Sequence, residues 1–240
     1  MKYKPRVDRN AKLRQRLKEL ALEKRRYGSP RLHWLLEREG LKVSYGRVER
    51  IYRREGLQLS KRKRKKDAAR LRVTLPMPEK ALERWSMDFI QDRLASGRFF
   101  RCLTIVDDFT KEAVAIEVDR SLPGQRVVGV LELLKLIRGV PKNITTDNGP
   151  EFISRALDEW AYRNKVNLNF IRPGKPTENA FIESFNGKFR DECLSENWFT
   201  SVEEAKEIIE TWRIEYNTKR PHKSLGKLTP SEFAAKMKTG

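Results

Sequence analysis

Histidine and cysteine are scarce in this 240-residue chain, which holds only two of each, at positions 33, 222, 102 and 193. None of them has a partner at the short spacing that zinc-binding or redox pairs use. A zinc module built from His and Cys is therefore excluded. We expect Cys102 and Cys193 to be reduced side chains packed in the interior of a cytoplasmic protein.

Long apolar runs are also missing. No stretch approaches the ~18 consecutive apolar residues that a membrane-spanning helix needs. The N-terminus, Met1-Lys-Tyr-Lys-Pro-Arg6, lacks the apolar core of a secretory signal. These absences predict a soluble protein of the cytoplasm with no membrane partner.

Acidic residues are outnumbered by basic ones. Lys and Arg contribute 52 residues against 33 Asp and Glu, which gives a net charge of +19. The hydrophobic share of 38% is low for a globular protein, and the charged share of 35% is high. Because positive charge attracts phosphate, the composition predicts a nucleic-acid partner. A basic ribosomal or membrane-surface protein is the alternative that composition leaves open.

Short helices with basic faces fill the first 60 residues. Apolar residues at helical spacing predict a helix within 9–26, a second that Ser29 caps and that ends near residue 39, and a third over 45–55. Gly40 can end the second helix, and Ser44 can cap the third. Two short helices joined by a glycine-containing turn are typical of a helix-turn-helix, whose second helix enters the DNA major groove. The candidate DNA contacts on the third helix are Arg47, Arg50 and Arg54.

Six consecutive cations follow the helices: Lys61, Arg62, Lys63, Arg64, Lys65 and Lys66. Like charges at this spacing repel one another and cannot be buried, so we expect the run to be a flexible tether that folds down on phosphate. These six residues are a second set of candidate DNA contacts. They open a basic linker predicted for residues 61–80.

From about residue 81 to 216 the sequence alternates between strand-like and helix-like patterns. Strands are expected at 85–91, 99–106, 113–118, 143–147 and 168–171, and helices at 123–138, 154–165, 177–193 and from 200 or 201 onward. Ser154, Thr177 and the pair Thr200 and Glu203 are the expected helix caps. This order suits a ribonuclease-H-like α/β fold, in which an antiparallel meander is extended by parallel strands and covered by helices.

Three acids stand at informative places in that pattern. Asp88 lies in the middle of the first expected strand, and Asp147 ends the fourth. Glu183 lies on a later helix, with 35 residues (148 to 182) between it and Asp147. If the first and fourth strands are neighbours, the two aspartates meet at one edge of the sheet. Carboxylate oxygens suit hard divalent cations and leave room for substrate phosphate, so the trio predicts a two-metal site.

The helix around Glu183 supports its inclusion. Spacings of four, three and four residues put Asn179, Glu183, Asn186 and Arg190 on one polar stripe. A neighbouring apolar stripe can pack on the sheet, and a purely structural amphipathic helix remains the alternative explanation. That apolar stripe consists of Ile182, Phe185 and Phe189.

Other acids near the trio have local explanations. Asp107 and Asp108 stand at an expected hairpin turn, where Asp accepts local hydrogen bonds. Glu151 lies in the loop after Asp147, and Glu178 falls in the first turn of a helix, where it complements the helix dipole. We assign these four acids structural roles. The same interpretation, packing or hydrogen bonding, is preferred for His222.

Two stretches carry a family resemblance: Thr145-Thr-Asp-Asn-Gly-Pro-Glu-Phe152 and Gly174-Lys-Pro-Thr-Glu-Asn-Ala-Phe-Ile-Glu-Ser-Phe-Asn-Gly-Lys188. They resemble the D,D(35)E core of retroviral-type integrases and bacterial insertion-sequence transposases. The segment from Tyr27 to Leu57 resembles the helix-turn-helix that precedes this core, and the segment from Tyr216 to Phe233 resembles the family's C-terminal pattern. The best match is the second-frame protein of the IS3 family.

The resemblance implies a DDE transposase that cleaves DNA and transfers strands at insertion-sequence ends. It implies two Mg²⁺ or Mn²⁺ ions held by Asp88, Asp147 and Glu183, with no covalent protein–DNA bond. It also implies four parts: a helix-turn-helix domain at 1–60, the linker at 61–80, an integrase catalytic core at 81–216 and a basic tail at 217–240. The DNA contacts expected in the core are Lys175, Asn179, Asn186, Lys188 and Arg190.

The expected partners are duplex DNA, both element ends and target, and further copies of the chain on that DNA. Proteins of the resembling family work as a fusion with an upstream first-frame segment that carries another helix-turn-helix and a leucine zipper. This chain lacks a sustained heptad repeat, so an upstream partner or fusion segment is also expected. Two other functions stay open: a transposase-derived DNA-binding regulator without catalysis, and a ribonuclease-H-type nuclease that cuts RNA–DNA hybrids.

Overall fold

A computed structural model describes residues 10–60, 76–172 and 179–238. The chain divides into two compact units, Met1–Asp67 and Ala68–Gly240, each described here by itself. No helix among the described residues is long and apolar enough to cross a membrane.

Three helices form the N-terminal unit: α1 (Ala11–Glu23), α2 (Ser29–Arg38) and α3 (Tyr45–Arg54). Gly40 follows α2 with a φ of +83°, a left-handed conformation that glycine adopts without a Cβ clash. The predicted helices and the glycine turn between the second and third are therefore present. The apolar stripes meet in one small core of Leu13, Leu17, Leu20, Tyr27, Leu32, Leu36, Val48, Ile51 and Tyr52.

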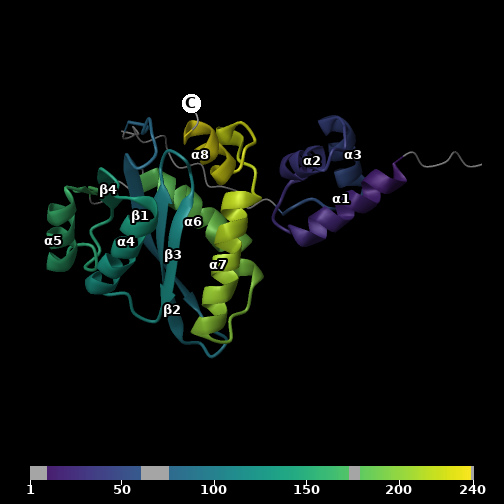
Figure 1. Cartoon of the computed structure of the whole chain (residues 1–240). Coiled ribbons are helices and arrows are strands. Elements are labelled where there is room, and N and C mark those ends of the chain that lie inside the picture. The colour runs from purple at the N-terminus through teal and green to yellow at the C-terminus, as the bar shows by residue number, and fades with distance from the viewer. Residues whose placement is uncertain (1–9, 61–75, 173–178, 239–240) are drawn as a thin grey trace, which may run out of the picture. The chain divides into compact units, whose positions relative to one another are not determined.

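A five-stranded sheet forms the centre of the second unit (Figure 1), with the strand order β3-β2-β1-β4-β5. The first three strands form an antiparallel meander, and β4 and β5 extend it in parallel from β1. This is the arrangement that the order of elements predicts. The strands are β1 (Arg84–Arg93), β2 (Phe99–Asp107), β3 (Ala113–Asp119), β4 (Asn143–Thr146) and β5 (Asn167–Phe170).

Helices cover both faces of the sheet (Figure 1). Successive strand residues point to opposite faces. Along β1, Met87 therefore packs toward α4 and α5, whereas Ile90 packs toward α6 and α7. Asp88 shares the parity of Ile90 and lies on the α6 side. These helices are α4 (Gly124–Arg138), α5 (Arg155–Asn164), α6 (Ala180–Glu192) and α7 (Val202–Thr218).

The predicted apolar stripe of α6 is confirmed. Ile182, Phe185 and Phe189 are almost fully buried in the core on that side of the sheet. Cys102 and Cys193 lie in the same core as free thiols. Burial raises the pKa of Cys193 to about 12 and also raises that of Cys102, so both are packing residues rather than reactive thiols.

Two helices begin one residue away from the predicted position. Ser29 is already the first residue of α2, Gly28 is its N-cap, and the Ser29 hydroxyl lies 3.2 Å from that of Tyr45. The side chain of Ser201 caps α7 by accepting from the N–H of Glu204 at 3.0 Å, one residue later than predicted. Ser154 caps α5 as predicted. Thr177 lies outside the described residues.

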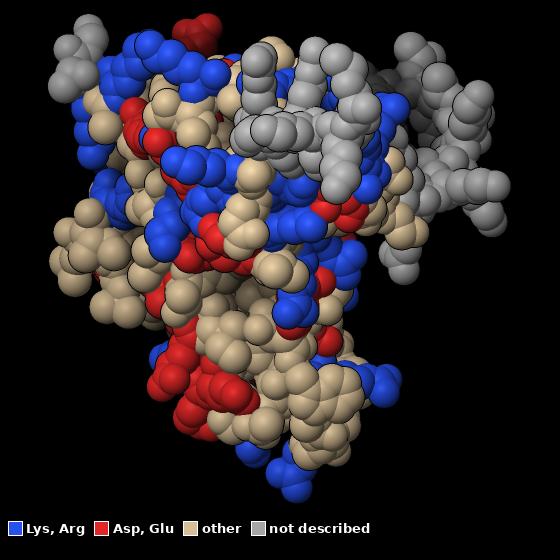
Figure 2. Space-filling model, turned by 90° about the vertical axis from the view of Figure 1, so that its right-hand side faces the viewer, with Lys and Arg blue, Asp and Glu red and all other residues tan. Residues whose placement is uncertain are grey.

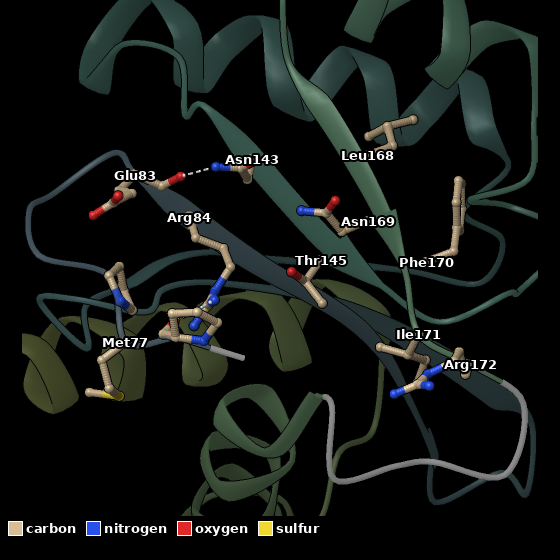
Figure 3. A pocket seen from close by; sticks show the side chains of 12 residues that line it. Met77, Glu83, Arg84, Asn143, Thr145, Leu168, Asn169, Phe170, Ile171 and Arg172 are labelled. Carbon is tan, nitrogen blue, oxygen red and sulfur yellow. Dashed lines mark hydrogen bonds between the residues drawn. The ribbon is translucent and has the colours of Figure 1, made fainter. Parts of the chain in front are cut away.

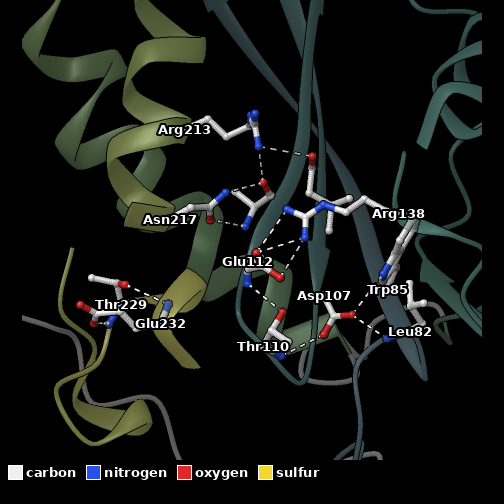
Figure 4. Close-up of polar contacts among 12 residues, drawn as sticks. Leu82, Trp85, Asp107, Thr110, Glu112, Arg138, Arg213, Asn217, Thr229 and Glu232 are labelled. Carbon is white, nitrogen blue, oxygen red and sulfur yellow. Dashed lines mark hydrogen bonds and ion pairs between the residues drawn. The ribbon is translucent and has the colours of Figure 1, made fainter. Parts of the chain in front are cut away.

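Polar contacts fix the turn between β2 and β3 to its neighbours (Figure 4). Asn217 of α7 accepts from the N–H of Ala113 at 2.8 Å and donates to its carbonyl at 3.0 Å. Asp107 has the structural role predicted for it, because its carboxylate accepts from the backbone N–H groups of Leu82, Phe109 and Thr110, each at 2.9 Å.

The C-terminal segment packs against α6. The predicted boundary at 216/217 falls inside α7, which continues to Thr218. Arg220, only 2% exposed, forms an ion pair at 2.6 Å with Glu192, the last residue of α6. His222 is buried with its ring 5.0 Å from that of Tyr216, which agrees with a packing role. The chain then forms α8 (Pro230–Lys238).

Candidate active site

Asp88 and Asp147 come from neighbouring parallel strands. In the β1–β4 ladder, Ser86 pairs with Thr145. Continuing that register by two residues sets Asp88 beside Asp147, on the same face of the sheet. The strand adjacency on which the sequence prediction depended is therefore confirmed.

Helix α6 is attached directly to Asp88. The side-chain amide of Asn186 donates to Asp88 Oδ2 at 2.7 Å. The hydroxyl of Thr104, on β2, lies 2.9 Å from Asn186 Oδ1 and 3.1 Å from the carbonyl oxygen of Asp88. Asn186 is buried, so these contacts fix both the carboxylate of Asp88 and the helix that carries Glu183.

Asp88 carries an unfavourable charge in the folded chain. Its pKa is raised from 3.8 to about 6, chiefly by burial and further by the negative charges of Asp147 and Glu183. Hydrogen bonds from the N–H of Phe89 and from Asn186 oppose this shift only in part. The site therefore contains negative charge that its protein neighbours do not neutralise.

Glu183 lies on an exposed part of α6, and partial burial raises its pKa. The negative charge of Glu183 adds to the raised pKa of Asp88 as the smallest of its causes. Within the ranges that the structure describes, however, no three His, Cys, Asp or Glu side chains are gathered closely enough to hold a metal ion. The two aspartates and Glu183 thus share an electrostatic environment without forming a closed set of ligands.

A cation–aromatic cluster that no sequence pattern indicated holds the first turn of α6. The guanidinium carbon of Arg84 lies 5.4 Å from the ring centroid of Phe181, and the ammonium of Lys111 lies 3.8 Å from it. Asp108 accepts from Arg84 at 2.6 Å and from the hydroxyl of Ser86 at 2.9 Å, deep in the protein. Burial lowers the pKa of Lys111 to about 8. Asp108 therefore has a structural role, but through a buried ion pair rather than through the predicted turn.

The loop after Asp147 is closely packed. The N–H of Gly149 donates to Asp147 Oδ1 at 3.0 Å, and a Cβ at position 149 would lie 3.0 Å from the same oxygen. A larger residue there would crowd the carboxylate. Glu151 pairs with Arg101 of β2, which lowers the pKa of Glu151 and agrees with a structural role.

The predicted DNA contacts differ in accessibility. Arg47, Arg50 and Arg54 are exposed on α3, and Arg190 is exposed on α6. Lys188 is half-buried and bonded to Ser184 of its own helix. Lys61 to Lys66, Lys175 and Glu178 lie outside the described residues. Figure 2 shows many Lys and Arg side chains in view, together with a group of Asp and Glu side chains at its lower left.

Two predicted DNA contacts are closed to solvent in the structure. Asn179 and Asn186 are 4% and 8% exposed. Neither amide can touch DNA without rearrangement, and Asn186 is engaged with Asp88 instead. For these two residues the structure does not support the prediction.

Three matches to known families cover most of the chain. Residues 78–176 and 164–230 each match an integrase core domain. Residues 8–66 match a helix-turn-helix-like domain. The fold is thus an integrase catalytic core, a ribonuclease-H-like sheet with helices, preceded by a helical region of the helix-turn-helix type.

Solved structures agree with this fold. The catalytic core of HTLV-2 integrase, in complex with magnesium, matches with a TM-score of 0.53 and 15% identity over 65% of this chain and 98% of that one. The simian T-cell lymphotropic virus intasome, in complex with a phosphatase regulatory subunit, matches with a TM-score of 0.61 and 15% identity. That match covers 91% of this chain and 74% of the other.

Relatives in bacteria are much closer in sequence. A 31.7 kDa protein of insertion element IS407 from Burkholderia multivorans is 52% identical over 95% of this chain and 82% of its own length. A 39.2 kDa protein of IS476 from Xanthomonas euvesicatoria is 46% identical over 93% of this chain and 65% of its own length. The transposase InsF of IS3A from Escherichia coli is 26% identical over 89% of this chain and 78% of its own length. The chain therefore belongs to the IS3 family of insertion-element transposases.

Proposed function

We propose that this protein cleaves DNA at the ends of its insertion sequence and joins those ends to target DNA, with Asp88, Asp147 and Glu183 as catalytic residues. One observation carries the proposal. When the register of the parallel strands β1 and β4 is continued by two residues, Asp88 lies beside Asp147, which directly follows β4, and the helix that bears Glu183 is hydrogen-bonded to Asp88 through Asn186.

The chemistry of the site fits Mg²⁺ or Mn²⁺. Carboxylate oxygens are the ligands that these hard cations prefer. The raised pKa of Asp88 marks negative charge that a cation would neutralise. Because the three carboxylates form no closed ligand set among the described residues, the exposed side chain of Glu183 must turn toward the aspartates to complete it. When bound, two such ions would activate the attacking oxygen and stabilise charge on the leaving one. The solved core of HTLV-2 integrase with magnesium lends support.

The remaining residues act by orientation. Asn186 holds the Asp88 carboxylate, and the Thr104 hydroxyl holds Asn186, so that Asp88 faces the position of Asp147. In cleavage, water attacks phosphorus and the 3′ oxygen leaves. In joining, that 3′-hydroxyl attacks a target phosphodiester and displaces the 3′ oxygen of the target strand, so no covalent protein–DNA bond is formed.

DNA affinity would come from basic residues other than the three carboxylates of the candidate site. Arg47 and Arg50, both exposed on α3, would contact bases in a major groove, and the run from Lys61 to Lys66 would add phosphate contacts. We propose that several copies act together on the element ends. The fold shared with an intasome subunit supports such an assembly. An upstream first-frame segment, fused or separate, completes end recognition.

Strand cleavage on end-containing DNA in Mg²⁺ or Mn²⁺ tests the catalytic assignment, with the upstream segment supplied. Asp88→Asn, Asp147→Asn and Glu183→Gln keep side-chain size and remove the charge that holds a cation. Each is expected to abolish cleavage and joining while DNA affinity stays close to that of the parent. Glu151→Gln, in the loop beside Asp147, is the matched control and should retain most activity.

Two outcomes would contradict the proposal. Metal-dependent cleavage by the Glu183→Gln protein would remove Glu183 from the site. Binding of element ends without cleavage by the parent chain, even with the upstream segment present, would favour a non-catalytic regulator.

A further inference from the structure

A hollow of about 330 Å³ lies beside the first turns of α6, and we call it the α6 hollow. Acidic and basic side chains both line the larger groove of about 710 Å³ over β1, β4 and β5 (Figure 3). In the α6 hollow, by contrast, the lining residues that the structure describes include lysines but no acid. Among them are Val106, Lys111, Phe181, Phe185, Lys188 and Tyr216. The α6 hollow therefore suits an occupant that carries negative charge.

The α6 hollow combines an aromatic floor with a cationic rim. Phe185 and Tyr216 are buried, with their rings edge to face and 5.0 Å apart. Phe181, Lys111 and Lys188 are only half-buried, so an occupant can reach them from solvent. The ammonium of Lys111 lies 3.8 Å from the ring centroid of Phe181, which shows that it can bind an aromatic face. A flat aromatic group with acids beside it would match both the floor and the rim.

The connection between α6 and α7 presents such an aromatic group. Trp198 is 78% exposed, although tryptophan is highly buried on average. The next residue, Phe199, is buried with its ring 5.4 Å from that of Phe100. On the other side, the side-chain amide of Asn197 donates to the carbonyl of Cys193 at 2.8 Å. Both neighbours of Trp198 are thus held by the core, so the exposed indole is fixed in place before any partner arrives.

The surroundings of Trp198 are acidic in a strongly basic chain. Residues 191–207 contain six acids and one base, whereas the whole chain has a net charge of +19. Glu192 is paired with Arg220, but Asp191 and Glu203 are exposed. Trp198 and these acids therefore complement the aromatic floor and the lysines of the α6 hollow.

Trp198 cannot enter the α6 hollow of its own chain, because α7 separates them. Trp198 comes before Val202, the first residue of α7, and Tyr216 in the floor of the hollow lies about 21 Å further along that helix. Figure 1 shows α7 as a straight helix along the sheet. A second copy of the chain can supply the indole instead.

We propose that Trp198 of one copy inserts into the α6 hollow of the next copy, with the acids around Trp198 facing Lys111 and Lys188. The two surfaces differ, so each copy in a pair still has one of them to offer and the copies join head to tail. Aromatic anchors in pockets dominate the energy of many interfaces, and tryptophan is prominent among them. The inference rests on the proposed assembly of several copies and specifies the contact between them.

Sedimentation velocity of the full chain, without DNA or metal, tests this contact apart from catalysis. The parent chain should self-associate as its concentration rises from about 1 to 100 µM, and less so at high salt, which screens the exposed charges. Trp198→Ala should weaken the association by about tenfold or more. Tyr162→Ala is the matched control: Tyr162 on α5 is 87% exposed, lies outside both surfaces and should leave the association unchanged.

A pair of variants distinguishes this contact from others. Ser224→Phe, at an exposed position of the α6 hollow, places a ring where the indole would enter and should weaken the association as Trp198→Ala does. The first variant keeps Trp198 and the second keeps the hollow, so a mixture of the two should form pairs that do not extend further. If circular dichroism shows that Ser224→Phe does not fold, Lys111→Met, which removes a cation from the rim, replaces it.

Three results would overturn the proposal. The parent chain could stay monomeric at about 100 µM. The Trp198→Ala chain could associate as the parent does, in which case the copies meet through another surface. The mixture of the two variants could stay monomeric, which would show that Trp198 and the α6 hollow are not partners. Each result concerns the contact alone, because Asp88, Asp147 and Glu183 are tested by strand cleavage.

Discussion

Asp88→Asn is expected to stabilise the protein above neutral pH when divalent metal is absent. Burial, with the charges of Asp147 and Glu183, raises the pKa of Asp88 from 3.8 to about 6 in the folded chain. A shift of about two pKa units corresponds to about 3 kcal/mol. Ionisation of Asp88 therefore lowers the free energy of unfolding of the parent protein, whereas the variant has no charge at this position.

The sign follows from proton linkage. Because the folded-state pKa lies above the unfolded one, the stability that protonated Asp88 contributes is complete below about pH 4 and is lost as the pH rises through about 6. The free energy of unfolding should therefore be nearly the same for parent and variant at about pH 4. At about pH 8 the variant should be more stable by up to about 3 kcal/mol.

The hydrogen bonds around position 88 can survive the substitution. If the Asn186 amide turns over, its oxygen accepts from the new amide and its nitrogen faces Thr104. The Thr104 hydroxyl is then free to donate to the carbonyl of residue 88, which already lies 3.1 Å away. A turn of one amide thus leaves no group unpaired, and the gain from removing the charge is retained.

Urea unfolding followed by tryptophan fluorescence measures the difference in the free energy of unfolding between parent and variant. Urea is uncharged, so it does not screen the interactions between the carboxylates. Four of the five tryptophans, at 85, 160, 198 and 212, belong to the second unit, so the signal reports mainly on it. Asp92→Asn, near the end of the same strand, is the control. Millimolar Mg²⁺ should stabilise the parent but not the variant, and so reduce the difference in their free energies of unfolding. A variant that is no more stable than the parent at pH 8, or a gap that does not change with pH, would refute the reasoning.

Other substitutions probe other contacts. Asp108→Asn should cost about 3–5 kcal/mol in urea unfolding because Arg84 would keep a buried charge without a partner, and a loss below about 1 kcal/mol would contradict that view. Phe181→Leu removes the ring held by Arg84 and Lys111, so cleavage should fall about tenfold at unchanged DNA affinity; normal cleavage would show that the cluster does not position Glu183. Replacing all six cations of Lys61–Lys66 by serine should reduce the slope of log affinity against log salt by up to about five. An unchanged slope would mean that the run faces solvent.

The sequence predicted the parts of the site that follow from periodicity. Alternation placed Asp88 and Asp147 on strands, and helical spacing separated the apolar stripe of α6 from its polar one. The order of elements then sufficed to predict the mixed sheet. These inferences need only local geometry.

The contacts between elements could not be predicted in the same way. Whether Asn186 meets Asp88 or DNA depends on how far α6 is rotated over the sheet, which no local pattern specifies. Asp108 does lie in the predicted turn after β2, but its pairing with Arg84 depends on how β1 and β2 are aligned, which no local pattern specifies. Helix starts shifted by a residue because Ser29 and Ser201 compete with neighbouring residues that have similar capping propensity.

The ion pair between Arg220 and Glu192 makes helix α6 depend on the last part of the chain. Glu192 ends the helix that carries Glu183, and both partners of the pair are almost fully enclosed. A polypeptide released from the ribosome before residue 220 would leave Glu192 enclosed without its counter-ion, at the cost of a loosened α6. On the function proposed above, a chain that ends before Arg220 would hold the helix that carries Glu183 less firmly and would lose cleavage, while the three helices of the first unit would be unaffected.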